Sequence, residues 1–67
     1  MDKKELTADI RAQYGNVLTK KDACKYLGVS RNTAKEFLDG VPTFQIGARE
    51  YYFAVDLAAR ISAAEVG

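Results

Sequence analysis

Apolar residues recur at the spacing of an α-helix near the start of the chain. Leu6, Ile10 and Tyr14 follow one another every four residues, with charged residues between them. This stripe predicts a helix over residues 2–14 that ends at the glycine directly after it. Residues 16–18 are expected to connect this helix to the next one.

Two short helices joined by a tight turn are predicted next. Thr19, with Asp22 three residues later, resembles a capping box and starts the first helix, which Gly28 ends. Ser30 is a good N-cap for the second helix, which ends at Gly40. So short a connection forces the two helices to cross steeply instead of lying antiparallel.

The same periodicity separates an inner set of side chains from an outer set in these two helices. We expect Val29 to fill the angle between the helices. Cys24 is expected to be a small core residue and not a nucleophile, because an unpaired cysteine commonly packs like a small apolar side chain. The inner residues are Ala23, Cys24, Leu27, Ala34, Phe37 and Leu38, and the outer residues are Arg31, Asn32, Lys35 and Glu36.

The period changes to two between residues 43 and 53, which predicts a β-hairpin. We expect Ile46 to face Tyr51 across this hairpin. Phe44 then faces Phe53, and all four side chains lie on one side of the hairpin. The aromatic members resemble a base-stacking platform, but we expect them to pack on the thin core instead.

The turn of this hairpin is expected at residues 47–50, with Arg49 at its tip. Because successive side chains of a strand point to opposite faces, Tyr52 points away from the other three hairpin aromatics. We therefore expect Tyr52 to be the most exposed aromatic residue.

A last helix is predicted from the apolar spacing of Leu57, Ala58 and Ile61. No repeat, linker or low-complexity segment interrupts the chain. We expect one domain, residues 1–67, of the α+β class and mostly α. Its parts are the first helix, the helix pair at residues 19–38, the hairpin at residues 43–53 and the last helix at residues 55–64.

Composition narrows the chemistry that the chain can perform. The chain has 67 residues, a formal net charge of +1, one cysteine and no histidine. It therefore lacks a Ser-His or Cys-His pair, and one cysteine can form neither an internal disulfide nor a zinc site. No glycine-rich phosphate loop occurs, and no apolar run approaches the ~18 residues of a membrane helix. We expect a cytoplasmic binding module that is not an enzyme and needs no cofactor or metal.

Two runs of sequence resemble a known family. The first run is LTKKDACKYLGVSRNTAKEFL, residues 18–38, and the second is VPTFQIGAREYYFAVDLAARI, residues 41–61. Together they are similar to the excisionase and MerR-like family of small winged helix-turn-helix DNA-binding proteins. The first run resembles the helix pair of that family, and the second resembles its short β wing and closing helix. Ala48 departs from the pattern, since the family commonly has two basic residues after the wing glycine.

This resemblance implies a protein that binds specific sequences of double-stranded DNA. The helix at residues 30–38 would lie in the major groove, and the wing would lie against the neighbouring minor groove or backbone. Free-standing members of this size are often excisionases of phages and other integrative mobile elements, which help an integrase to excise the element. Neighbouring copies are expected to cooperate on DNA. A small transcriptional regulator of the same fold is the alternative, and a protein-interaction module is a third reading.

The residues assigned to DNA contact lie at the starts of the paired helices and in the wing. Arg31 and Asn32 fall in the first turn of the second helix, where Arg can bind guanine and Asn can bind adenine through two hydrogen bonds. A solvated charge at Arg31 and a helix-turn role for Asn32 are the alternatives. Residues 19–49 carry six Lys or Arg and three Asp or Glu, a local charge of +3. The assigned residues are Thr19, Lys20, Lys21, Ser30, Arg31, Asn32, Thr33, Lys35 and Arg49.

Overall fold

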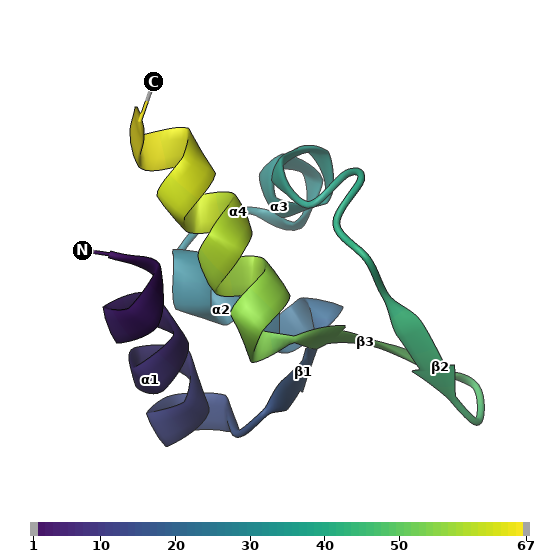
Figure 1. Ribbon diagram of the computed structural model, residues 1–67. Helices are drawn as coiled ribbons and strands as arrows, with labels where there is room; N and C mark the ends of the chain where they lie inside the picture. The colour runs from purple at the N-terminus through teal and green to yellow at the C-terminus, as the bar shows by residue number, and fades with distance from the viewer. Residues whose placement is uncertain (1, 67) are drawn as a thin grey trace.

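Helices and short strands alternate along the chain in the computed structural model, which describes residues 2–66 (Figure 1). The described residues form four helices and one three-stranded antiparallel sheet, so the expected α+β class, mostly α, is confirmed. None of these helices is long and apolar enough to cross a membrane. In chain order the elements are α1 (Lys3–Tyr14), β1 (Val17–Thr19), α2 (Lys20–Leu27), α3 (Arg31–Phe37), β2 (Phe44–Ile46), β3 (Arg49–Phe53) and α4 (Ala54–Val66).

The starts of the helices follow from capping side chains. The Asp2 carboxylate accepts a hydrogen bond of 2.8 Å from the Glu5 backbone N–H and begins α1. At α2, Thr19 and Asp22 form the predicted capping box, with each side chain accepting from the other's backbone N–H at 3.2 and 3.3 Å. Gly28 ends α2 with φ 70°, a left-handed conformation that glycine adopts without strain.

The segment expected to be a connection is a strand instead. β1 pairs antiparallel with β3, so that Val17 lies opposite Phe53 and Leu18 lies opposite Tyr52. The strand order is β1-β3-β2, and the expected two-stranded hairpin is therefore part of a three-stranded sheet. Three residues offer too few alternating positions for a strand to be recognised from sequence, and only the distant β3 supplies its hydrogen-bond partners.

β2 and β3 are joined by a two-residue turn that begins at Gly47, and not by the four residues expected. Phe44 therefore lies opposite Tyr51 and Ile46 lies opposite Arg49, which corrects the predicted pairing. Gly47 has φ 63°, the positive value that the first position of a tight hairpin turn requires. Arg49 is accordingly the first residue of β3 and not the tip of the turn.

The two faces of the sheet are exchanged relative to the prediction. Tyr52, expected to be the most exposed aromatic, is only 4% exposed. Phe53, expected in the core, is 44% exposed, while Phe44 and Tyr51 are half-buried on the same face as Phe53. The predicted placement of the hairpin's apolar residues on one side is correct. The helices cover the other side, however, where Leu18 and Tyr52 lie opposite each other in the core.

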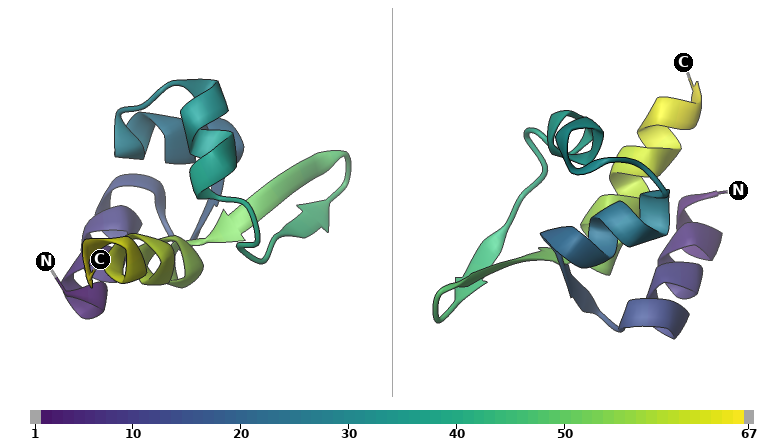
Figure 2. Two further views of the ribbon diagram at one scale, coloured as in Figure 1. Left: turned by 90° about the horizontal axis from the view of Figure 1, so that it is seen from above. Right: turned by 180° about the vertical axis from the view of Figure 1, so that it is seen from behind.

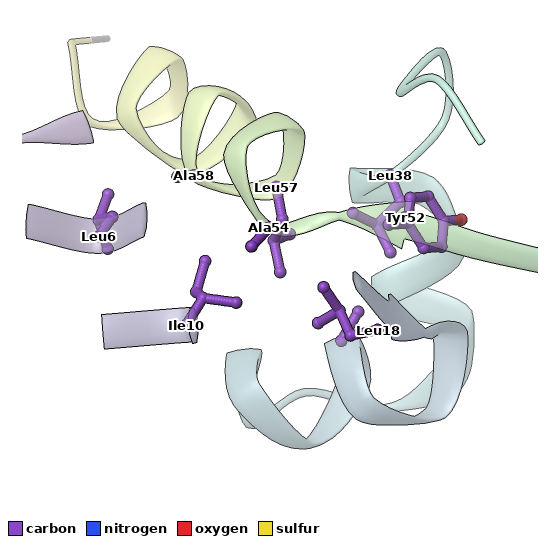
Figure 3. Close-up of a cluster of buried hydrophobic side chains, with 9 residues drawn as sticks. Leu6, Ile10, Leu18, Leu38, Tyr52, Ala54, Leu57 and Ala58 are labelled. Carbon is purple, nitrogen blue, oxygen red and sulfur yellow. The ribbon is translucent and has the colours of Figure 1, made fainter. Parts of the chain in front are cut away.

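The core lies between α1, α4 and the covered face of the sheet (Figure 3). Ile10 from α1, Leu18 from β1 and Leu57 from α4 are each less than 2% exposed. Seen from above, α2 and α3 lie on one side of the molecule, and α1 and α4 lie on the other (Figure 2). The first and last helices of the chain therefore pack together and support the central pair, α2 and α3.

Candidate nucleic-acid interface

α3 presents a polar face to solvent. Ala34 is its buried residue and is 0% exposed, whereas Arg31, Asn32 and Lys35 are all exposed. Arg31 and Asn32 belong to the first turn, and Lys35 lies one turn beyond Arg31 on the same side of the helix. These three side chains can therefore meet a ligand laid along α3.

Two hydroxyl groups organise the first turn of α3. Ser30 is the N-cap, and its Oγ accepts a hydrogen bond of 3.3 Å from the Thr33 backbone N–H. The Ser30 hydroxyl donates in turn to Thr33 Oγ1 at 3.0 Å. The hydroxyl hydrogen of Thr33 then remains available to donate outward, for example to a phosphate oxygen, without disturbing the cap.

The end of α3 is held by a residue that the sequence did not point to. Arg60 in α4 donates through Nε to the Phe37 carbonyl oxygen at 2.8 Å. Its guanidinium carbon also lies 4.5 Å from the centre of the Phe37 ring. A cation at this end of a helix is favoured by the helix dipole, and a guanidinium over an aromatic ring adds a cation–π attraction. Arg60 therefore fastens α3 to α4 from the side opposite its polar face.

Val29 does not fill the angle between α2 and α3, and that prediction is wrong. Its side chain is 39% exposed. The buried residues of the two helices are Ala23 and Ala34, each 0% exposed. Small side chains are therefore the buried ones of this helix pair, while the turn that joins the helices lies at the surface.

A second group of the predicted residues meets where α2 begins. Thr19, Lys20, Lys21, Arg49 and Glu50 line one open groove of about 410 Å³. The N-terminal end of a helix offers backbone N–H groups and a positive dipole end, both of which favour an anion. Arg49 is distant from the two lysines in sequence, and the pairing of β1 with β3 brings them together.

A separate groove of about 520 Å³ runs along α3 and is lined by Asn32, Lys35, Glu36 and Asp39. Its two carboxylates disfavour phosphate near the last turn of α3, so a polyanion is better placed at the first turn, beside Arg31. The predicted residues thus fall into two groups, one on α3 and one at the start of α2. Thr19 and Lys20 are half-buried, and the exposed members are Lys21, Ser30, Arg31, Asn32, Thr33, Lys35 and Arg49.

The search for metal-binding groups and the comparison with known proteins give no further information about the function. Within residues 2–66, no group of three or more His, Cys, Asp or Glu side chains is placed to hold a metal ion. Comparison with protein families, curated proteins and solved structures finds no match to this chain. The chemistry of the exposed side chains therefore carries the functional conclusion.

Proposed function

We propose that the protein binds specific sequences of double-stranded DNA as a winged helix-turn-helix domain. The observation that carries this proposal is the polar face of α3, which is capped at its start and fastened at its end. α3 lies in the major groove in this proposal. Residues 44–53, which we call the wing, contact the neighbouring minor groove or the backbone.

The first turn of α3 has the chemistry to read base edges. An α-helix fits the major groove of B-DNA, and the N-terminal residues of a recognition helix reach the bases. Arg31 offers the two-pronged donor that matches guanine, and Asn32 offers the donor and acceptor pair that matches adenine. Both side chains are exposed, and neither is needed to bury the core.

The groove at the start of α2 supports contacts to the backbone. Lys20, Lys21 and Arg49 place three cations in one groove, with Glu50 as the opposing charge. Contacts of this kind position a protein on the duplex without reading its sequence. In this proposal α3 recognises the base sequence of the DNA. The groove at the start of α2 contacts the DNA backbone and fixes the position of the protein along the duplex.

Within this class the proposal extends to an excisionase of a phage or other integrative mobile element, with an integrase as partner. Its support is the resemblance of residues 18–38 and 41–61 to the excisionase and MerR-like family. An excision reaction with the integrase of the mobile element that carries the gene tests this role. Stimulated excision supports it, and DNA binding without stimulation identifies a transcriptional regulator instead.

Selection of bound sequences from random duplex DNA, followed by gel-shift titration of the enriched site, tests the binding itself. Arg31→Ala should weaken binding by about 5- to 150-fold, or ~1–3 kcal/mol, and relax the base preference at one position. Lys25→Ala is the matched control, because it removes the same charge from an exposed position of α2 outside both groups. Failure to retain any duplex at low salt, or equal losses in the two variants, would overturn the proposal.

A further inference from the structure

Three aromatic rings form a stack on the open face of the sheet. Phe44 lies between the other two, with its ring centre 4.5 Å from that of Phe53 and 5.8 Å from that of Tyr51. The planes are nearly parallel, at 25° and 29°. Phe53 is 44% exposed and the neighbouring Ile46 is 59% exposed. We call Phe44, Tyr51 and Phe53 the aromatic face.

The aromatic face is not explained by packing of the core. The chain has four Tyr and three Phe, and three of these seven aromatic residues lie on the face of the sheet opposite the buried Tyr52, outside the core cluster of the described residues. The rings shield one another only in part, and exposed apolar area carries a cost of about 25 cal/mol per Å² relative to burial. A small domain has few apolar residues with which to form its core, so its aromatic side chains are expected to be buried. Aromatic side chains that gather at the surface instead indicate a surface that binds a ligand.

Two cationic grooves are lined in part by residues next to the two ends of β3. Arg49, two residues before Tyr51 on the same side of β3, lines the groove that also contains Lys20 and Lys21. β3 runs from this end of the molecule directly into α4, which lies beside α1 (Figure 1). Val55, two residues after Phe53 and 41% exposed, lines the second groove.

The second groove belongs to α1 and has no acidic residue in its lining. Its volume is about 500 Å³, and its residues are Lys3, Lys4, Thr7, Ala8, Arg11 and Val55. The first groove has three cations and one carboxylate, and the second has three cations and none. A long ligand that runs along β3 across the aromatic face can therefore continue toward a cationic groove in both directions.

We propose that the aromatic face and its two flanking grooves bind single-stranded nucleic acid. Exposed bases continue the ring stack from Phe53 and Tyr51, and the phosphates on either side occupy the cationic grooves. Stacking of bases on aromatic side chains, with cations along the backbone, is how proteins bind single strands without sequence preference. An acidic peptide would satisfy the charges but has no planar groups to extend the stack. A duplex has its bases already stacked on one another.

Fluorescence anisotropy with a 12-nucleotide oligothymidylate tests the stacking. Phe53→Ala should weaken binding by about 5- to 150-fold. Phe53→Tyr, which keeps the ring, should bind like the unchanged protein. Val29→Ala is the matched control, because Val29 is also an exposed apolar residue, at 39%, and lies away from the aromatic face between α2 and α3. Circular dichroism of each variant checks that the fold is retained.

An abasic strand of the same length separates stacking from charge, since it keeps every phosphate and lacks every base. The proposal requires that the abasic strand bind more weakly than oligothymidylate, and that polyglutamate compete poorly. Equal binding of the abasic strand, or equal affinities for Phe53→Ala and Val29→Ala, would overturn it.

Both proposals use the groove at the start of α2, but the variants at Arg31 and Phe53 distinguish them. Arg31→Ala should leave oligothymidylate binding unchanged, because Arg31 lines neither flanking groove. If the aromatic face fails to bind single strands, the effect of Arg31→Ala on duplex binding still decides the proposed function. If Arg31→Ala weakens both ligands equally, a separate single-strand site is excluded.

Discussion

At the scale of single residues, a hydrogen bond between two side chains joins α2 to α1. The Tyr26 hydroxyl of α2 donates to the Asp9 carboxylate of α1 at 2.6 Å. Asp9 also accepts from the Gln13 side chain at 3.1 Å, and the Tyr26 ring meets Tyr14 edge-on at 6.3 Å. Burial, and then the hydrogen bond and charge of Asp9, raise the pKa of Tyr26 to about 12.

This raised pKa predicts a loss of stability in alkali. The folded protein holds the phenol proton more tightly than the unfolded chain, whose Tyr pKa is 10.0. The contribution of Tyr26 to the free energy of unfolding is therefore complete below pH 10 and is lost as the pH rises from 10 to about 12. Urea unfolding at a series of pH values measures this decline.

Tyr26→Phe is the matched comparison, since it removes only the hydroxyl. At pH 8 we expect it to lower the free energy of unfolding by ~1 kcal/mol, the net contribution of one such hydrogen bond. The difference between the two proteins should shrink as the pH rises above 10. Burial also raises the pKa of Tyr52, but both proteins contain Tyr52 and its effect cancels. A difference that stays constant to pH 12 would show that the Tyr26 proton is not linked to folding.

Residue-scale features were the most predictable from the sequence. The capping box at Thr19 and the left-handed Gly28 depend on atoms within a few residues, so their residue types suffice to place them. The outward face of α3 followed from the helical period in the same way. The fastening of α3 by Arg60 was not predictable, because its acceptor on Phe37 is 23 residues away and nothing near Arg60 in sequence marks it.

At the scale of elements, β3 shows why alternation alone cannot orient a strand. Tyr51, Tyr52 and Phe53 are successive aromatic residues, so the pattern gives two faces of similar character. The choice between them depends on where the helices lie, and on β1, whose Leu18 pairs with Tyr52 in the core. The predicted turn of four residues, where the structure has two, also gave the wrong pairing between β2 and β3. As a result Arg49 was predicted at the tip of the turn, although it is the first residue of β3.

Substitutions at adjacent positions of β3 should have very different costs. Tyr52→Ala removes a nearly buried ring and should lower the free energy of unfolding by ~3 kcal/mol or more. Phe53→Ala removes an exposed ring and should cost less than ~1 kcal/mol. Chemical denaturation measures both, and Tyr52→Leu provides a milder variant if the alanine form does not fold. Equal costs would contradict the observed orientation of the strand.

The attachment of α3 to α4 predicts a local effect on α3. Arg60→Ala removes both the hydrogen bond to the Phe37 carbonyl and the cation over the Phe37 ring. Amide hydrogen exchange in α3 should therefore accelerate more than exchange in α1, because opening of α3 no longer has to break this contact. Arg60→Lys, which keeps the charge but loses the planar contact, should give an intermediate rate. A uniform change across all helices would instead indicate a global loss of stability.

At the scale of the whole molecule, the net positive charge is small and is concentrated in the middle of the chain. The chain carries a net charge of +1, while residues 19–49 carry +3. If the protein binds DNA as proposed, so small a net charge predicts weak attraction to DNA of other sequences. With ~3–5 phosphates neutralised per monomer, the slope of log affinity against log salt concentration should be about −3 to −4.

Arg49→Ala should weaken binding to every duplex by a similar factor and reduce the size of that salt slope by ~1. Arg49 belongs to the groove at the start of α2 and not to α3, so the base preference should remain. Gel-shift titrations at several salt concentrations measure the slope, with Lys25→Ala as the control. A changed base preference with an unchanged slope would assign Arg49 to base recognition.

The pairing of β1 with β3 has a consequence for the newly made chain. Leu18 is synthesised early, but its partner Tyr52 and the α4 residue Leu57 are synthesised near the end. α2 and α3 are therefore synthesised before the residues of β3 and α4 that support them. Pairing of β1 with β3 closes a loop of about thirty residues, and the entropic cost of closing it rises only slowly with its length. Translation that stops before Leu57 should yield α2 and α3 without the buried residues of α4 that support them, a product that proteases degrade readily.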